Sequence, residues 1–153
     1  MIQRNHQGEF ELRLTNQKQR IATLQQVPLL AVFSRADLGT LARRVEEVEV
    51  PAGAFLTRQG AIGAEVYVVL DGSFTIRRNS RKVDTRKKGG VFGELSLIDG
   101  MPRRADVVAD KDSIVLVLHK GDLDPLLQNP RVAGRVMQNL ASRLKAADKK
   151  LLG

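Results

Sequence analysis

Residues 89–105 read GGVFGELSLIDGMPRRA, and this stretch is the most informative part of the sequence. Its glycines at 89, 90 and 93 let the backbone turn sharply and approach a ligand without obstruction by a Cβ atom. Residues 94–98 can form one helical turn, whose unpaired amide N–H groups attract phosphate. Arg103 can add a bidentate guanidinium to the same phosphate. Glu94 then suits a ribose hydroxyl, because a carboxylate repels a phosphate.

Glycine-rich loops before short helices are common, so the glycines alone indicate only a turn. The stretch lacks the sequence Gly-Lys-Ser/Thr, which excludes the phosphate-binding loop of a nucleotide triphosphatase. Its position is more informative, because it lies between a run of short strands and a final helix.

The strands are indicated on both sides of this stretch. Residues 47–50 alternate between acidic and apolar side chains, and residues 66–70 form an apolar run that ends at Asp71 and Gly72, a pair typical of hairpins. Further strands are expected at residues 105–109 and 114–118. Several short strands at this spacing predict an antiparallel sandwich, barrel or roll.

Helical patterns flank the strands. The first 45 residues are predicted to be helical, with Ser34 and Asp37 placed as in a capping box. Asn129 and Pro130 are the N-cap and first residue of a last helix. Its apolar residues follow a spacing of four and three, at positions 133, 137, 140, 144, 147 and 151. This stripe either packs on the domain's own core or contacts a partner helix.

The amino-acid composition limits the classes of protein to which the chain can belong. The 153 residues are 42% apolar and 27% charged, which suits one globular domain. Absence of cysteine excludes disulfides and thiolate chemistry. The longest apolar run has seven residues, at 27–33, whereas a membrane span needs about 18. The N-terminus lacks a secretory signal pattern, so a cytoplasmic location is expected.

The net charge of +8 is concentrated in two windows. Residues 77–88 carry seven basic side chains against one acidic side chain, and residues 131–150 carry six against one. Such an excess favours an anionic partner. The alternative is that the two windows are a solvated hairpin tip and a solvated helix face.

The chain resembles the cyclic nucleotide-binding domain family, which includes catabolite-activator-like regulators and the regulatory subunits of cyclic-nucleotide-dependent kinases. Residues 92–97, FGELSL, are similar to the family's phosphate-binding cassette, which Pro102 and Arg103 close. The resemblance covers residues 28–150. It implies an α+β, mainly β fold: an eight-stranded antiparallel, jelly-roll-like β-roll between N-terminal helices and two C-terminal helices, the last of which is a lid.

One domain with three parts is therefore expected. Residues 1–45 would be the N-terminal helical segment, residues 46–118 the β-roll with its cassette at 92–105, and residues 119–153 the C-terminal helices.

The resemblance also implies the residues of the site. Gly93, Leu95 and Ser96 would contact the cyclic phosphate and ribose, Glu94 the ribose 2′-hydroxyl, and Arg103 the phosphate. The full expected ligand-binding set is Phe92, Gly93, Glu94, Leu95, Ser96, Arg103, Arg104 and Ala105. The expected lid over the purine is Leu140, Arg143, Leu144, Ala147 and Asp148. No aromatic residue follows Phe92, so this lid would be aliphatic, with Arg143 able to stack on the base.

Arg104 departs from the family, which usually has Ala, Ser or Thr at this position. A second guanidinium could assist the phosphate or crowd the pocket, and preference between cAMP and cGMP stays open. The expected ligand is cAMP, with cGMP as the alternative, and no cofactor or metal is expected.

The expected function is that of a regulatory sensor, which couples nucleotide binding to movement of its last helix. An enzyme is not expected, because His6 and His119 are isolated and no catalytic carboxylate pair occurs. Two alternatives stay open: an interaction module that has lost its ligand, and the sensor half of a transcription regulator. Since the sequence ends at Gly153, without a recognition helix, sequence-specific nucleic-acid binding is not expected. A homodimer or an effector protein could contact residues 130–151.

Overall fold

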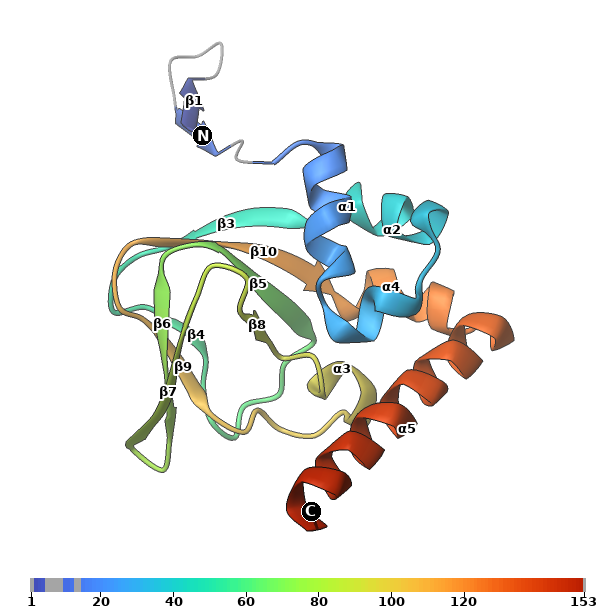
Figure 1. Ribbon diagram of the computed structural model, residues 1–153. Helices are drawn as coiled ribbons and strands as arrows, with labels where there is room; N and C mark the ends of the chain where they lie inside the picture. Colours follow the sequence, from blue (N-terminus) through green and yellow to red (C-terminus); the bar gives the residue numbers. More distant parts are fainter. Residues whose placement is uncertain (1, 5–9, 13–14, 153) are drawn as a thin grey trace.

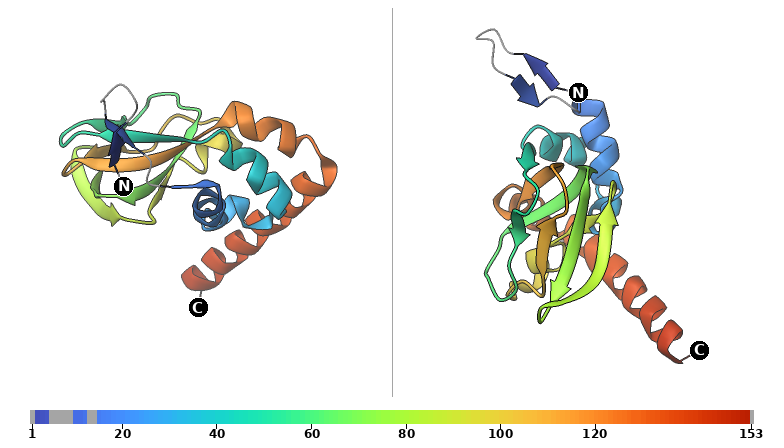
Figure 2. Two further views of the ribbon diagram at one scale, coloured as in Figure 1. Left: turned by 90° about the horizontal axis from the view of Figure 1, so that it is seen from above. Right: turned by 90° about the vertical axis from the view of Figure 1, so that its left-hand side faces the viewer.

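The computed structural model describes residues 2–4, 10–12 and 15–152. Two four-stranded antiparallel sheets lie face to face (Figure 2), and the helices gather at one end of them (Figure 1). One sheet has the order β3-β10-β5-β8 and the other the order β4-β9-β6-β7. The predicted eight-stranded roll between N-terminal and C-terminal helices is confirmed.

The strands of the roll are β3 (Glu46–Val50), β4 (Phe55–Thr57), β5 (Glu65–Asp71), β6 (Ser73–Arg78), β7 (Arg81–Lys87), β8 (Val91–Phe92), β9 (Asp106–Ala109) and β10 (Ser113–His119). Before the roll come α1 (Gln17–Gln25), the 3-10 helix η1 (Pro28–Val32) and α2 (Arg35–Ala42). Helix α3 (Ser96–Asp99) follows β8, and α4 (Lys120–Leu127) and α5 (Pro130–Leu152) follow β10.

Two hydrophobic cores lie on the two faces of the β3-β10-β5-β8 sheet. Between the sheets, Phe74 and Phe92 pack edge to face with ring centroids 5.7 Å apart, beside Val69 and Val115. On the other face, residues such as Leu116 pack against η1, α2 and α4. Because both faces are covered, the central strands β5 and β10 are apolar almost throughout rather than alternating.

The N-terminal segment departs from the helical prediction. Residues 2–4 and 10–12 form two short antiparallel strands, β1 (Ile2–Arg4) and β2 (Phe10–Leu12), and the first helix begins only at Gln17. Asn16 caps that helix, because its side chain accepts the Gln19 N–H while the Gln19 side chain accepts the Asn16 N–H. The prediction of an N-terminal helical segment is therefore wrong for residues 2–4 and 10–12.

Asp71 and Gly72 do not form the predicted hairpin. β5 pairs with β10 and β8, whereas β6 pairs with β9 and β7, so the chain passes here from one sheet to the other. Gly72 has φ +113°, and a Cβ at this position would overlap Ser113 of β10. The hairpin lies instead between β6 and β7, where Asn79 and Ser80 both have positive φ.

Helix α5 packs on η1 through a different stripe from the predicted one. Val132 and Val136 are buried, and Leu140 is partly buried against the same core. Met137 and Leu144 are 70% and 71% exposed. The predicted stripe is thus divided: Leu140 contacts the core, while Met137 and Leu144 face away from it. No helix in the described part of the chain is both long and apolar enough to cross a membrane.

Candidate functional site

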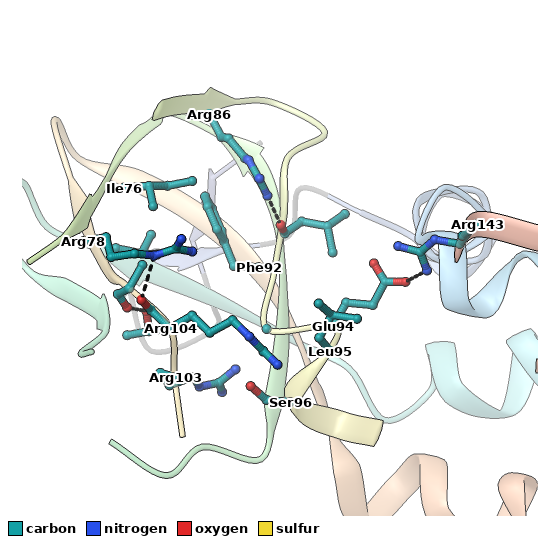
Figure 3. Close-up of a pocket in the computed structure, with 15 residues that line it drawn as sticks. Ile76, Arg78, Arg86, Phe92, Glu94, Leu95, Ser96, Arg103, Arg104 and Arg143 are labelled. Atoms are coloured by element: carbon teal, nitrogen blue, oxygen red, sulfur yellow. Dashed lines mark hydrogen bonds and ion pairs between the residues drawn. The ribbon is translucent and has the colours of Figure 1, made fainter. Parts of the chain in front are cut away.

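A pocket of about 310 Å³ opens between the β6–β7 hairpin, the loop that carries α3, and α5 (Figure 3). Its lining includes all eight residues of the predicted ligand-binding set, which come from two segments, residues 92–96 and 103–105. The lining also includes Arg143 of α5. The fold therefore brings the two ends of the cassette together around one cavity.

Arg103 lies at the base of this pocket and is 6% exposed. Its Nη2 donates to the carbonyl oxygen of Glu65 at 2.9 Å and to Glu65 Oε2 at 3.3 Å. Its Nη1 is buried and has no hydrogen-bond partner among the described residues. Because an unsatisfied buried donor is costly, this nitrogen is poised to bind an acceptor inside the pocket.

Two glycines make room for this guanidinium. Gly93 has φ +85°, and a Cβ there would overlap Arg103 Nη1 and lie 2.5 Å from the Glu65 carbonyl oxygen. A Cβ at Gly63 would overlap the guanidinium as well. Gly93 is therefore required both for its left-handed backbone and for its lack of a side chain.

Tyr67 and Glu65 complete the surroundings of Arg103. The guanidinium carbon lies 5.9 Å from the centroid of the Tyr67 ring. Burial raises the pKa of Tyr67, and the Glu65 carboxylate raises it further while Arg103 opposes the change. Tyr67 therefore stays protonated at neutral pH and adds no negative charge beside the arginine.

Glu94 joins three parts of the structure. Its side chain is 11% exposed, and its Oε1 accepts the N–H of Leu29 in η1 at 2.8 Å. The same oxygen forms an ion pair with Arg143 Nη1 of α5, also at 2.8 Å. Within the described part of the chain, Oε2 accepts no hydrogen bond. One oxygen thus fixes the carboxylate, and the other keeps its capacity to accept a hydroxyl.

Ser96 is buried at the start of α3, while Leu95 is about half exposed at the pocket. Arg104 lines the pocket, and its guanidinium is paired with Asp99, because Nη2 donates to Asp99 Oδ2 at 2.5 Å. The N–H of Met101 and the Arg104 guanidinium hold the pKa of Asp99 below its ordinary value. Arg104 is thereby anchored to the end of α3.

Arg78 and Arg86 also line the pocket, although the sequence indicated them only as part of a basic tip. The signal that could have revealed Arg78 is strand alternation, since Ile76 and Arg78 lie on one face of β6 and both line the pocket. Arg86 stacks on the ring of Phe92, with its guanidinium carbon 5.3 Å from the ring centroid.

Three of the other predicted lid residues, Leu140, Leu144 and Asp148, do not line the pocket. Leu140 packs against the helical core, and Leu144 and Asp148 are exposed. The side chain of Ala147 lies outside the described part of the chain, as does His6. His119 ends β10 and lies 3.5 Å from a Glu46 carboxylate oxygen, away from the pocket.

Comparison with known proteins points to one family. A family model described as a cyclic nucleotide-binding domain matches residues 47–129. A cyclic nucleotide-gated potassium channel of Rhizobium etli is 30% identical over 118 residues, which are 76% of this chain and 33% of the channel. The chain thus spans about a third of that relative's length.

Two solved structures are similar over most of the chain. The N-terminal domain of a transcriptional regulator from Streptomyces coelicolor is 30% identical with a TM-score of 0.72, covering 83% of this chain and 95% of that domain. The regulatory domain of Toxoplasma gondii PKA, crystallised with cAMP, is 25% identical with a TM-score of 0.67. That similarity covers 85% of this chain and 50% of the chain of that regulatory domain.

Proposed function

Since the chain belongs to the cyclic nucleotide-binding domain family, we propose that it is a sensor that binds cAMP in the Arg103 pocket and relays binding through α5. The observation that carries this proposal is the buried guanidinium of Arg103, whose Nη1 lacks a partner among the described residues and lies beside Gly93. A cyclic phosphate has one negative charge and two exocyclic oxygens, which can accept from this nitrogen.

The ribose would be held by Glu94. Its Oε1 is fixed by Leu29 and Arg143, so the carboxylate is oriented before a ligand arrives. The 2′-hydroxyl donates to Oε2, and the negative charge of Glu94 stays apart from the phosphate that Arg103 binds. Leu95, about half exposed at the pocket, offers an apolar surface to the purine.

The relay to α5 would use two features of that helix. Arg143 already connects α5 to the cassette through Glu94. The next residue, Leu144, is exposed and can move onto the purine. A ligand shifts such an equilibrium only by its differential affinity for the two positions of the helix, so contacts between α5 and the base must supply the coupling.

This function is non-catalytic, and it leaves the effector open. The potassium channel and the transcriptional regulator place similar domains in proteins of different activity. The effector of this chain would contact the surface that moves with α5.

Titration calorimetry with cAMP and cGMP tests the proposal, with Arg103→Ala as the variant and Arg81→Ala, an exposed arginine outside the pocket, as its control. Removal of the charge-assisted pair should cost about 1.5–3 kcal/mol, roughly a ten- to 150-fold loss of affinity. Arg81→Ala should bind as wild type does. If the affinity of Arg103→Ala stays within about twofold of the wild-type affinity, the nucleotide binds elsewhere. No binding of either nucleotide by the wild type would favour the ligand-free interaction module.

A further inference from the structure

The pocket carries more positive charge than a cyclic mononucleotide requires. Among the described residues, five arginines line it, and Glu94 is the one acidic residue in the lining. A cyclic mononucleotide brings one negative charge, which Arg103 alone can pair. Glu94 Oε1 is already paired with Arg143 of α5, at the opposite wall from the β6–β7 hairpin. The arginines of the hairpin therefore need a different explanation.

Arg78 and Arg86 enter the pocket from this hairpin, while Arg103 and Ser96 lie at the other end of the cavity (Figure 3). Arg78 and Arg86 each donate one hydrogen bond to a main-chain carbonyl. Arg78 Nε donates to the carbonyl oxygen of Arg104 at 3.3 Å, and Arg86 Nη1 donates to that of Val91 at 2.6 Å. A carbonyl fixes a guanidinium without neutralising it, so the other nitrogens of each group keep their charge and donor capacity.

The charges of these two arginines are weakly balanced. Asp84 lies 3.6 Å from Arg86, but both side chains are about half exposed, so the pair is screened by solvent. In the part of the chain that the structure describes, Arg78 forms no ion pair. By contrast, Arg104 is tightly paired with Asp99 and does not share in this site.

From these observations we infer a second anion subsite formed by Arg78 and Arg86, so that the preferred ligand is a purine nucleotide with two phosphate groups. The inference rests on the proposed function, which assigns the first phosphate to Arg103. Two guanidiniums that keep unused donors at one end of a pocket suit a phosphate, because a phosphate accepts hydrogen bonds on several oxygens. Two kinds of ligand share this chemistry: a cyclic dinucleotide, and a nucleoside 3′,5′-bisphosphate.

Titration with each ligand in turn distinguishes these two kinds of ligand by their affinities. Purified wild-type chain is titrated with cAMP, cyclic di-AMP and adenosine 3′,5′-bisphosphate, and then with the three guanine counterparts, so that the base is matched. At least one two-phosphate ligand should bind tenfold or more tightly than the cyclic mononucleotide of the same base. If the cyclic dinucleotide binds more tightly, the second subsite accepts a phosphate within a ring. If the bisphosphate binds more tightly, the second subsite accepts a terminal phosphate.

The double variant Arg78→Ala/Arg86→Ala tests the assignment to these residues. Its preference for the two-phosphate ligand should fall at least tenfold. The control Arg81→Ala/Lys82→Ala removes the same charge from the same hairpin outside the pocket, and it should keep the wild-type preference. Both pairs are exposed, so both variants should unfold near the wild-type temperature.

Three results would overturn the second subsite. In the wild type, cAMP and cGMP could each bind at least as tightly as every two-phosphate ligand of the same base. The pocket variant could lose affinity equally for all ligands, or the control variant could lose the preference to the same extent. In each case, cAMP binding that still requires Arg103 would leave the proposed function standing. If neither cyclic mononucleotides nor two-phosphate ligands bind the wild type, the proposed function fails as well.

Discussion

Gly93 and Arg103 act as one unit at the scale of single residues. The Arg103 guanidinium occupies the space that a side chain at position 93 would fill. Gly93 also turns the chain toward α3 with φ +85°. The backbone of Arg103 is fixed too, because its N–H donates to the Ala61 carbonyl oxygen and its own carbonyl accepts the Gly60 N–H. Backbone pairing with residues 60 and 61 and the absence of a side chain at Gly93 thus fix the position of Arg103, which we propose binds the phosphate.

We predict that Gly93→Ala destabilises the chain and abolishes cAMP binding, since its Cβ overlaps Arg103 and the Glu65 carbonyl. Gly100→Ala is the matched control, because Gly100 also has positive φ, at +63°, but nothing lies within 4 Å of its Cβ position. Gly100→Ala should lower the free energy of unfolding by only about 1–2 kcal/mol, because alanine is strained in a left-handed backbone. Urea unfolding and calorimetry measure both effects. Equal destabilisation by the two substitutions would mean that Arg103 moves aside at little cost.

The sequence allowed the eight cassette residues of the pocket to be predicted, because they lie in two short segments with recognisable chemistry. It did not reveal Glu65 as the partner of Arg103, since that contact follows from the packing of residues 38 positions apart. Nor did it separate Arg78 and Arg86 from their solvated neighbours. Their assignment depends on strand register and on which face of the hairpin covers the cavity.

At the scale of elements, α5 shows why an apolar spacing alone does not identify the buried face of a helix. Two overlapping stripes are present: Val132, Val136 and Leu140 pack on the core, while Met137 and Leu144 do not. The buried stripe has steps of four and four, and the predicted stripe has steps of four and three. Both spacings keep side chains on one face of a helix, so only the position of η1 decides between them.

We predict that Leu144→Asp leaves the stability of the ligand-free chain nearly unchanged, because Leu144 is 71% exposed. Its affinity for cAMP should fall at least fivefold, since closure would place a carboxylate against the purine. Ser142→Asp adds the same charge at an exposed neighbouring position and should have little effect on either property. Thermal unfolding and calorimetry provide the two readouts. Equal losses of affinity in both variants would indicate a general charge effect and not lid contact.

At the scale of the whole molecule, the roll and the helices meet at the cassette. Glu94 contacts η1 and α5 simultaneously, while Arg103 is anchored to β5 through Glu65. A ligand that binds both side chains would therefore act on the roll and on the final helix together. The three-zone order of helix, strand and helix was predictable from hydrophobic period, whereas this convergence depends on contacts between distant segments.

Hydrogen exchange of the wild type and Arg103→Ala, with and without saturating cAMP, tests the central claim that nucleotide binding at the cassette is relayed through α5. In the wild type, cAMP should increase amide protection at residues 93–103 and also change it at residues 130–150, while β9 and β10 stay unchanged. At the same cAMP concentration, Arg103→Ala should show neither change. Protection of the cassette in the wild type with identical exchange throughout residues 130–150 would contradict the claim, because the final helix would then be a fixed element.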